Sequence, residues 1–415
     1  MSELIVIADD LTGAVDTGVQ FVKHGIATVV TGIEYLRECS LWSDFSVIVV
    51  NTESRHSSLC ESASIVRTVS EEAIRRGVRW FYKKSDSTLR GNIGSEIDAL
   101  MKAARHDRMM FIPAFPDAGR TVIDGFLFVN GVPLQETSYA NDPLNPVRSN
   151  FIPDILRGQT DFNLHLVPVA ALGKGGGELL EKKGIFIFDA AGNDDLNRIR
   201  EFLEKNSLLH FCAGPAVFAS LIAQSAALNR READCYEPVS PLLIVNGSLN
   251  EVSLEQLHCA AKKGVKCFKA DILDLHGELN SRSVEQIRRE LMEHRTVILT
   301  SALEPGDALS GEGIFRRVGE VFGYLTKKII EHRGDVTVAV FGGDTASAVS
   351  LALRLNYVVP VSEISPGLTF CMGSTGKQKI PFISKSGGFG GREIISELQV
   401  FVSEGQRAED RLQVK

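Results

Sequence analysis

The segment Lys83–Gly94 concentrates side chains that could bind and activate a small polar substrate. It combines two lysines and an arginine with an aspartate, two serines, a threonine and two glycines. Cationic side chains bind carboxylates and phosphates, and an aspartate can accept the proton of a substrate hydroxyl. The alternative is a capped turn, in which Asp86, Ser87 or Asn92 bonds local backbone amides. On this segment alone the two interpretations stay equally open.

The flanking sequence predicts a loop between a strand and a helix. An apolar run that includes Trp80, Phe81 and Tyr82 precedes the segment and is typical of a buried strand. Ile97 and Leu100 follow it at a spacing that places them on one face of a helix. The polar side chains are therefore expected at the carboxyl end of a strand, where open parallel sheets bind ligands.

Two further polar groups are expected at the same edge of this sheet. Asp9 and Asp10 follow the apolar run Leu4–Ala8, and Arg55 comes shortly after the apolar run Val47–Val50. Carboxylates in this position can serve chemistry, but an aspartate before a helix also caps it. We expect one of the two aspartates to be structural.

The alternation of strands and helices predicts an α/β fold with two domains, each a mainly parallel sheet flanked by helices. Charged residues and prolines interrupt the pattern between Asn229 and Pro241. We place the domain boundary there, with an N-terminal domain over 1–232 and a C-terminal domain over 240–415. A β-hairpin excursion is predicted in the first domain, where Asn130-Gly131 suits a type I′ turn.

The second half contains the stronger phosphate-binding signals. A strand runs into Gly342-Gly343-Asp344-Thr345, and another into the glycine-rich stretch Ser384–Gly391. Glycines let backbone amides approach an anion, and a helix N-terminus favours negative charge. Loops at Asn246-Gly247-Ser248 and Ser365-Pro366-Gly367 are predicted to join the same crevice. A dinucleotide site has little support, because no Gly-x-Gly-x-x-Gly follows the first strand.

Composition narrows the class of protein. The 415 residues carry 45 basic and 52 acidic side chains, a formal charge of -7 that gives no electrostatic case for nucleic acid or a membrane surface. No apolar run approaches the ~20 residues that span a bilayer, and the N-terminus is expected to be a first strand instead of a signal peptide. The seven cysteines are scattered, which is typical of reduced residues in a cytoplasmic protein. The sequence leaves open whether copies of the chain associate.

The order of these motifs resembles that of the four-carbon acid sugar kinase family. The matching segments run along nearly the whole chain: Ala8–Ala14 with Asp16, Lys84–Asn92, Pro113–Pro116 with Gly119 and Arg120, Gly342–Ala346, and Lys385–Gly390. The resemblance implies an N-terminal domain that binds a sugar acid and a C-terminal domain that binds ATP. It also implies transfer of the γ-phosphoryl group to the terminal hydroxyl, which gives a 4-phosphate, with Mg²⁺ bridging the phosphates.

Carried onto this chain, the resemblance and the residue types give two sets of candidates. The sugar acid would be held by Asp9, Arg55, Lys84, Ser85, Asp86, Ser87 and Arg90. The nucleotide would be held by Ser248, Gly342, Gly343, Asp344, Thr345, Gly367, Gly387, Gly388, Phe389 and Gly390. Asp86 is the first candidate for the catalytic base and Asp10 the second, and no residue is assigned to a metal.

The substrate is less closely defined than the reaction. Ser87–Asn92 is more similar to the threonate and erythronate kinases than to the 3-oxo-tetronate branch, which favours D-threonate, L-threonate or D-erythronate. Ser85 departs from the family pattern, which usually has a bulky apolar residue there. The alternatives are a kinase of 3-oxo-tetronate or another small hydroxy acid, and a catalytically silent sugar-acid-binding protein.

Overall fold

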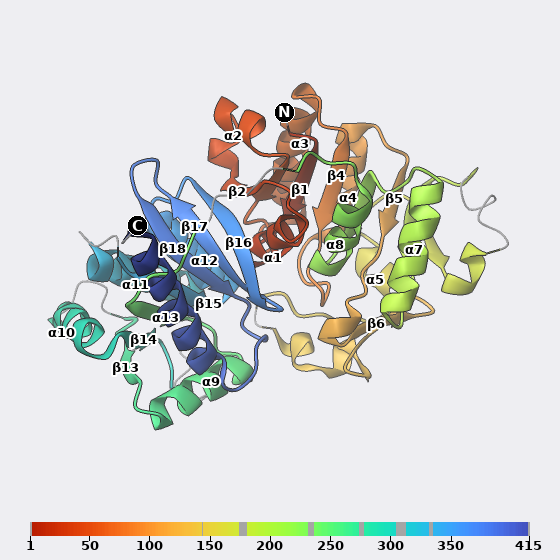
Figure 1. Ribbon diagram of the computed structural model, residues 1–415. Helices are drawn as coiled ribbons and strands as arrows, with labels where there is room; N and C mark the ends of the chain where they lie inside the picture. The colour runs from red at the N-terminus through yellow and green to blue at the C-terminus, as the bar shows by residue number, and fades with distance from the viewer. Residues whose placement is uncertain are drawn as a thin grey trace. The chain divides into compact units, whose positions relative to one another are not determined.

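The computed structural model describes residues 2–142, 144–173, 181–230, 236–273, 278–303, 313–331 and 335–413. The chain divides into two compact units, Met1–Glu232 and Ala233–Lys415. Each unit is built on its own run of hydrogen-bonded strands covered by helices, so the predicted α/β class with mainly parallel sheets is confirmed (Figure 1). None of the helices within the described residues is long and apolar enough to cross a bilayer.

The sheet of unit 1 is parallel throughout, in the order β2-β3-β1-β4-β11-β5-β10-β9. Its strands are β1 Leu4–Ala8, β2 Thr28–Gly32, β3 Val47–Asn51, β4 Trp80–Lys84, β5 Arg108–Phe111, β9 Leu164–Val167, β10 Gly184–Phe188 and β11 Phe211–Gly214. The apolar residues of β1 are 0 to 1% exposed, as expected for a strand covered on both faces.

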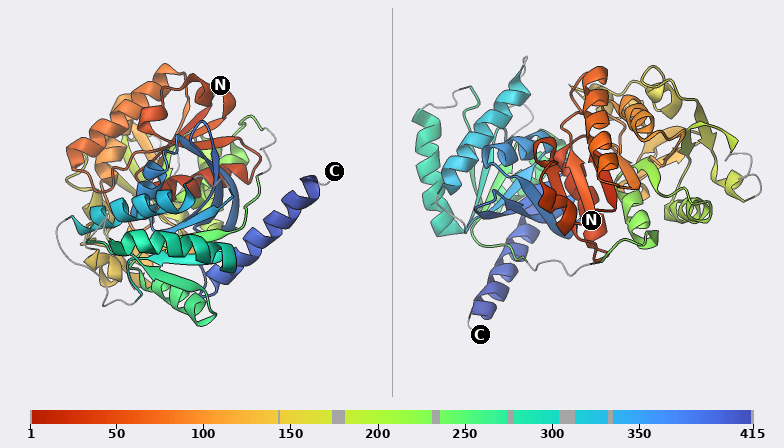
Figure 2. Two further views of the ribbon diagram at one scale, coloured as in Figure 1. Left: turned by 90° about the vertical axis from the view of Figure 1, so that its left-hand side faces the viewer. Right: turned by 90° about the horizontal axis from the view of Figure 1, so that it is seen from above.

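Helices cover both faces of this sheet. The helices α1 Leu11–Val22 and α8 Ala216–Ser225 pack together on one face, and α3 Leu59–Arg75 and α4 Ile93–Ala104 pack together on the other (Figures 1 and 2). The capping box of Ser58 and Glu61 fixes the start of α3. The remaining α-helices with described bounds are α2 Cys39–Asp44, α5 Ile152–Leu156 and α7 Asn193–Lys205.

The predicted hairpin is part of a small antiparallel sheet of β6 Arg120–Ile123, β7 Phe126–Val129 and β8 Val132–Pro133. Asn130 and Gly131 join β7 to β8 with φ values of 51° and 80°. Two successive positive φ values are what a type I′ turn requires, which confirms the turn predicted from Asn-Gly.

The sheet of unit 2 is mixed, in the order β13-β14-β12-β15-β18-β17-β16. Its parallel strands are β12 Leu242–Asn246, β13 Lys266–Lys269, β14 Thr296–Thr300, β15 Thr337–Phe341 and β18 Lys379–Lys385. The sheet is continued in antiparallel fashion by β16 Tyr357–Ser365 and β17 Leu368–Ser374.

The core of unit 2 lies between this sheet and the helices α9 Glu251–Lys262 and α13 Ile394–Gln413. Leu257 of α9 and Leu398 of α13 are both buried in it. The opposite face is covered by α10 Glu278–His294, α11 Ile314–Ile330 and α12 Gly343–Ala352, each packed against the next (Figure 2). Because β12, β15 and β18 are parallel neighbours, the loops that follow them lie at one edge of this sheet.

Candidate functional site

Three neighbouring parallel strands of unit 1 gather the candidate residues for the sugar acid. The order β3-β1-β4 places the carboxyl ends of these strands side by side. Asp9 and Asp10 follow β1, Arg55 follows β3, and Lys84 ends β4. Residues that are far apart in the sequence therefore meet at one edge of the sheet.

Arg55 ties the aspartates together. Its Nε and Nη2 donate to the two carboxylate oxygens of Asp9 at 2.7 and 3.0 Å, and its Nη1 donates to Asp10 Oδ2 at 2.8 Å. Asp10 is also the N-cap of α1, since its Oδ1 accepts from the amide of Gly13 at 3.0 Å. One of the two aspartates is thus structural, as expected, and the guanidinium of Arg55 is already occupied by carboxylates.

Asp86 is paired with a second arginine. Arg90 donates from Nε to Asp86 Oδ2 at 2.8 Å and from Nη2 to Asp86 Oδ1 at 3.0 Å. Burial favours the neutral acid, but Arg90, Arg55 and the hydrogen bond from Thr88 hold the pKa of Asp86 well below its ordinary value. Asp86 is therefore ionised at neutral pH and keeps its ability to accept a hydrogen bond from a substrate hydroxyl.

The two oxygens of Asp86 differ in how fully they are occupied. Oδ2 accepts from the amides of Thr88 and Arg90, both at 3.3 Å, and from the Thr88 hydroxyl at 2.5 Å. Asp86 thus also does what the capped-turn interpretation expected of it. Asn92 does not, because its side chain donates to the carbonyls of Ser54 and Ser57. Oδ1 accepts from Arg90 Nη2 and lies 3.7 Å from Arg55 Nη2, so it has fewer donors than Oδ2.

Lys84 is the cation of this cluster that remains available to a ligand. Its residue is 6% exposed, and within the described residues its Nζ has no hydrogen-bond or ion-pair partner. A Cβ placed on Gly13 would lie 2.6 Å from this Nζ, so the ammonium rests against the first turn of α1. The neighbouring Ser85 has a buried hydroxyl that also lacks a partner among the described residues. A buried cation and a buried hydroxyl in consecutive residues are both polar groups that a ligand could satisfy, and a cation suits a ligand carboxylate.

The adjacent lysine has a different environment. Lys83 is 1% exposed, and its Nζ lies 2.8 Å from Glu96 Oε2. The other oxygen of Glu96 accepts a hydrogen bond from Ser54. This buried network links β4 to α4 and to the segment before α3, and it stabilises the loops that carry Arg55 and Asp86.

The loop between β4 and α4 is itself held in an unusual backbone conformation. Leu89 is 2% exposed and has a φ of 58°, in the left-handed region that non-glycine residues rarely adopt. Its buried side chain anchors the loop while Arg90 reaches both Asp86 and, at 3.1 Å, Asp142. Asp142 was missed by the sequence reasoning, because nothing in its own segment indicates a partner on another loop.

The described residues form no metal cage. No group of three or more His, Cys, Asp or Glu side chains in that part of the chain could hold a metal ion. The aspartates of the cluster are instead engaged by arginines and by the α1 N-terminus.

In unit 2 the candidate nucleotide residues also come from neighbouring strands. The parallel strands β12, β15 and β18 are adjacent, and their carboxyl ends lead into Ser248, into Gly342 and into the loop Ser386–Gly391. Ser248 lies at the centre of these loops. A Cβ on Gly387 would lie 2.4 Å from Ser248 Oγ, and one on Gly342 would lie 3.5 Å from the backbone nitrogen of Ser248.

Glycine is required at two of these positions. Gly342, with a φ of 107°, begins α12, whose first turn holds Gly343, Asp344 and Thr345. Gly367 has a φ of 72°, and a Cβ there would lie 2.5 Å from the ring of Phe389. The amide of Ser386 donates to the carbonyl of Gly367 at 3.0 Å. The structure therefore brings the ten predicted nucleotide residues together in four adjoining loops.

Three buried polar residues beside these loops were not among the predicted site residues. Ser253 and Gln256 of α9 and Lys385 at the end of β18 are each 0% exposed. Their side chains contact the backbone of the glycine loop. The sequence carries no signal for the two helical residues, because a serine and a glutamine in a helix are ordinarily solvated.

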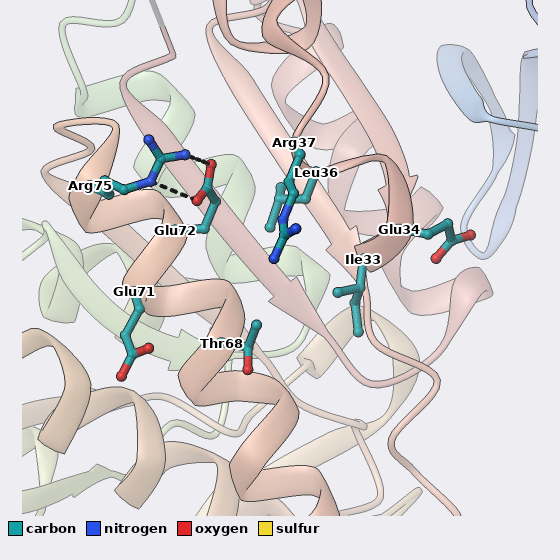
Figure 3. Close-up of a pocket in the computed structure, with 8 residues that line it drawn as sticks. All are labelled: Ile33, Glu34, Leu36, Arg37, Thr68, Glu71, Glu72 and Arg75. Carbon is teal, nitrogen blue, oxygen red and sulfur yellow. Dashed lines mark hydrogen bonds and ion pairs between the residues drawn. The ribbon is translucent and has the colours of Figure 1, made fainter.

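A separate open pocket of about 520 Å³ lies in unit 1 between the turn after β2 and the C-terminal half of α3 (Figure 3). Its lining mixes acidic, basic and apolar side chains, with Arg75 paired to Glu72 at 2.5 Å. The residues that line it are Ile33, Glu34, Leu36, Arg37, Thr68, Glu71, Glu72 and Arg75. None of them belongs to the two candidate sets, so this pocket is distinct from the candidate site.

Two family models match the chain. A sugar-binding N-terminal domain matches residues 4–222, and a nucleotide-binding C-terminal domain matches residues 243–395. The first range contains the cluster around Arg55, and the second contains the glycine loops around Ser248.

Curated relatives match along most of their length. A D-threonate kinase of Salmonella typhimurium is 31% identical, with 97% of this chain and 99% of that protein covered. A D-erythronate kinase of Heliobacterium modesticaldum is 27% identical over 88% of this chain and 89% of the relative. A 3-oxo-tetronate kinase of Brucella melitensis is 26% identical over 95% and 94%.

Solved structures share the fold. A crystal structure from Salmonella typhimurium LT2 superposes with a TM-score of 0.78 at 22% identity, covering 96% of this chain and 99% of the other. One from Haemophilus influenzae gives a TM-score of 0.71 at 23% identity, with 96% and 100% covered.

Proposed function

The chain belongs to the four-carbon acid sugar kinase family, and from this membership we propose that it transfers the γ-phosphoryl group of ATP to the terminal hydroxyl of a four-carbon sugar acid. As a member it is a kinase that phosphorylates an alcohol group. The observation that carries the proposal is the position of the two clusters. The cluster of acids and cations lies in the half that matches a sugar-binding model, and the glycine loops lie in the half that matches a nucleotide-binding model.

The sugar acid would bind at the edge formed by β3, β1 and β4. Lys84 and the hydroxyl of Ser85 would receive its carboxylate, because they are the buried polar groups there without a described partner. Arg55 would hold Asp9 and Asp10 in place instead of competing for the carboxylate. The aspartates would accept hydrogen bonds from the substrate hydroxyls, and the hydroxyl of Ser87 would donate or accept one.

Asp86 is proposed as the residue that orients the reacting hydroxyl and accepts its proton. Phosphoryl transfer depends on positioning and on stabilisation of charge, so a weakly basic but permanently ionised carboxylate is adequate. Asp86 meets this condition because its arginine partners keep it ionised, and its Oδ1 is the less occupied oxygen. Asp10 is the second candidate, and its carboxylate caps α1 and also accepts hydrogen bonds from Thr12 and Arg55.

The nucleotide would bind over the loops that surround Ser248. Backbone amides of the glycine loop and the first turn of α12 would face the phosphates, and Thr345 and Ser248 would add hydroxyl donors. Mg²⁺ would enter with the ATP, since the described residues offer no metal cage and Mg²⁺ in such sites is held largely by phosphates and water.

The proposed substrates are D-threonate, L-threonate and D-erythronate, with 3-oxo-tetronate as the second candidate. The segment Ser87–Asn92 favours the first three acids. We keep 3-oxo-tetronate as the second candidate because a 3-oxo-tetronate kinase is 26% identical to this chain, about as similar as the D-erythronate kinase at 27%. Ser85 places a small polar side chain at the position that would contact the acid, so the preference among these acids is expected to depend on it.

The test is a panel of the four acids, each with ATP and Mg²⁺, assayed by coupled detection of ADP. We expect one acid to exceed the others in kcat/KM and its product to carry phosphate on the terminal carbon, located by phosphorus-coupled NMR. Binding of an acid without any ADP formation would instead favour a silent sugar-acid-binding protein. A turnover confined to 3-oxo-tetronate would replace the favoured substrates with the second candidate.

A further inference from the structure

The backbone carbonyls of the glycine loop in unit 2 point toward buried side chains. Lys385 Nζ donates to the carbonyls of Ser386 and Gly387 at 3.2 and 3.1 Å, and Ser253 Oγ donates to that of Gly387 at 2.8 Å. The ammonium is also 3.3 Å from Ser253 Oγ. Two side chains from different elements thus bind the first part of the loop from its inner side.

Gln256 holds the rest of the loop in the same way. Its Nε2 lies 3.1, 2.9 and 3.1 Å from the carbonyl oxygens of Phe389, Gly390 and Gly391. Gln256 and Ser253 are three residues apart on α9, so they share one face of that helix. The carbonyls of five loop residues are therefore turned inward by three buried side chains.

This arrangement determines where the amides point. In a planar trans peptide the N–H is antiparallel to the C=O, so a carbonyl bound on the inner side sends the next residue's amide outward. The amides that follow the carbonyls bound by Lys385 and Ser253 are those of Gly387 and Gly388, and the amides that follow the carbonyls bound by Gln256 are those of Gly390, Gly391 and Arg392. None of these five amides has a hydrogen-bond acceptor among the described residues. Successive outward amides form a concave site for an anion.

The burial of these three side chains indicates a role beyond supplying hydrogen bonds to the loop carbonyls. Lys385, Ser253 and Gln256 are each 0% exposed, and the Oε1 of Gln256 is buried without a hydrogen-bond partner among the described residues, which is unfavourable. Water could solvate the carbonyls of a surface loop without this burial. Lys385 has no carboxylate partner among the described residues, and its Nζ lies 4.7 Å from the centre of the Phe341 ring.

We propose that Gln256, assisted by Ser253 and Lys385, is a positioning residue that holds the glycine loop with its carbonyls inward, so that its amides bind the terminal phosphates of the nucleotide. The inference rests on the proposed function, because it concerns the same nucleotide site. Gln256 acts through the loop and is not expected to touch the nucleotide itself. Burial lowers the pKa of Lys385 to about 7, so a bound phosphate would favour its charged form.

The test compares two variants of nearly constant shape with a control on the same helix. Gln256→Met keeps the volume but removes the donor, and Gln256→Glu replaces the donor with an acceptor that faces three carbonyl oxygens. Leu257→Met changes the adjacent buried core residue, whose apolar side chain cannot donate a hydrogen bond to the loop carbonyls. Binding of ADP and of adenosine to the full chain is measured by calorimetry, with thermal melting as the check on folding.

We expect Gln256→Met to weaken ADP binding about tenfold, which corresponds to the net loss of one or two hydrogen bonds to phosphate. Gln256→Glu is expected to weaken it further, while adenosine binding and the KM of the sugar acid stay unchanged in both. Leu257→Met should bind ADP like the wild type. If Gln256→Met does not fold, Ser253→Ala serves as the milder variant, with a loss of roughly threefold for ADP alone.

Unchanged ADP binding in Gln256→Met, or an equal loss for ADP and adenosine, would overturn this inference and leave the proposed function intact. A wild-type protein that binds no ADP would overturn the proposed function, and the inference with it.

Discussion

Lys83 and Lys84 offer a matched pair of substitutions that separates substrate binding from stability. The two lysines are adjacent at the end of β4 and are 1% and 6% exposed. Lys83 has a carboxylate partner at 2.8 Å in Glu96, whereas Lys84 has no described partner. We predict that Lys84→Met weakens binding of the sugar acid but keeps the stability, whereas Lys83→Met lowers the stability but keeps the affinity for the sugar acid.

Lys84→Met removes the cation that is proposed to bind the carboxylate of the sugar acid. A hydrogen bond to a charged group contributes about 1.5–3 kcal/mol, so the Kd of the acid should rise roughly 10- to 150-fold. The free energy of unfolding should change by less than about 1 kcal/mol, because no described group loses its partner. Affinity for ADP should not change.

Lys83→Met leaves Glu96 as a buried carboxylate without its cation. Breaking a buried pair in this way costs about 3–5 kcal/mol of unfolding free energy. The folded fraction should nevertheless bind the acid with a Kd close to that of the wild type, since the Lys83 ammonium faces Glu96 and the carbonyl of Ile7.

The assay combines urea denaturation with calorimetric titration of the acid in the presence of a non-hydrolysable ATP analogue. A Kd in Lys84→Met within threefold of the wild type, with stability retained, would refute the assignment of Lys84 to the carboxylate. A Lys83→Met protein as stable as the wild type would refute the argument about the buried pair.

Three further predictions concern charge in the two sites. Asp86→Asn should lower kcat by about 10²- to 10⁴-fold without changing ADP affinity, measured by coupled turnover and calorimetry, and full activity would remove Asp86 from the role of base. Burial opposes ionisation of Asp9 and Asp86, but their arginine partners lower the pKa values of both carboxyl groups below the ordinary 3.8. The ionised groups therefore stabilise the fold above pH 3.8, and this stability is lost as pH falls through the folded-state pKa values. Urea denaturation between pH 6 and 3 should show this decline, and a flat profile would contradict it. Burial lowers the pKa of Lys385 from 10.5 to about 7, so the unfolded chain binds more protons than the folded chain between these values. The unfolding free energy of the wild type relative to Lys385→Met should therefore rise as pH rises from about 7 to about 10. A pH-independent difference between the two proteins would contradict the depressed pKa.

The regular elements could be predicted because their signals are local. The continuous apolar runs of β1 and β3 and the Asn130-Gly131 turn each carry their own information, and the structure bears them out. The start of the helix after Asp9-Asp10 is not signalled by apolar periodicity. Asp10 caps α1 at Leu11, and small residues fill its first turn without an apolar periodicity.

The candidate site could be predicted only in part. Residues that follow strands were identifiable, because parallel strands bring their carboxyl ends together whatever their order. The pairing between them was not, since the sequence does not say that Arg55 is occupied by Asp9 and Asp10 while Lys84 is not. Ser253 and Gln256 were missed for the same reason, because their partners lie more than 130 positions away in the chain.

The inward anchoring of the glycine loop also bears on how such loops can be transferred or recognised. A graft of residues 384–391 into another α/β host would carry the glycines and Lys385, but it would leave behind the two side chains of α9 that orient the carbonyls. The transplanted loop would then be free to turn its peptides either way, and its affinity for phosphate would fall. For the same reason, a divergent homologue that keeps every glycine but replaces Gln256 with an apolar residue should be suspected of having lost its nucleotide site.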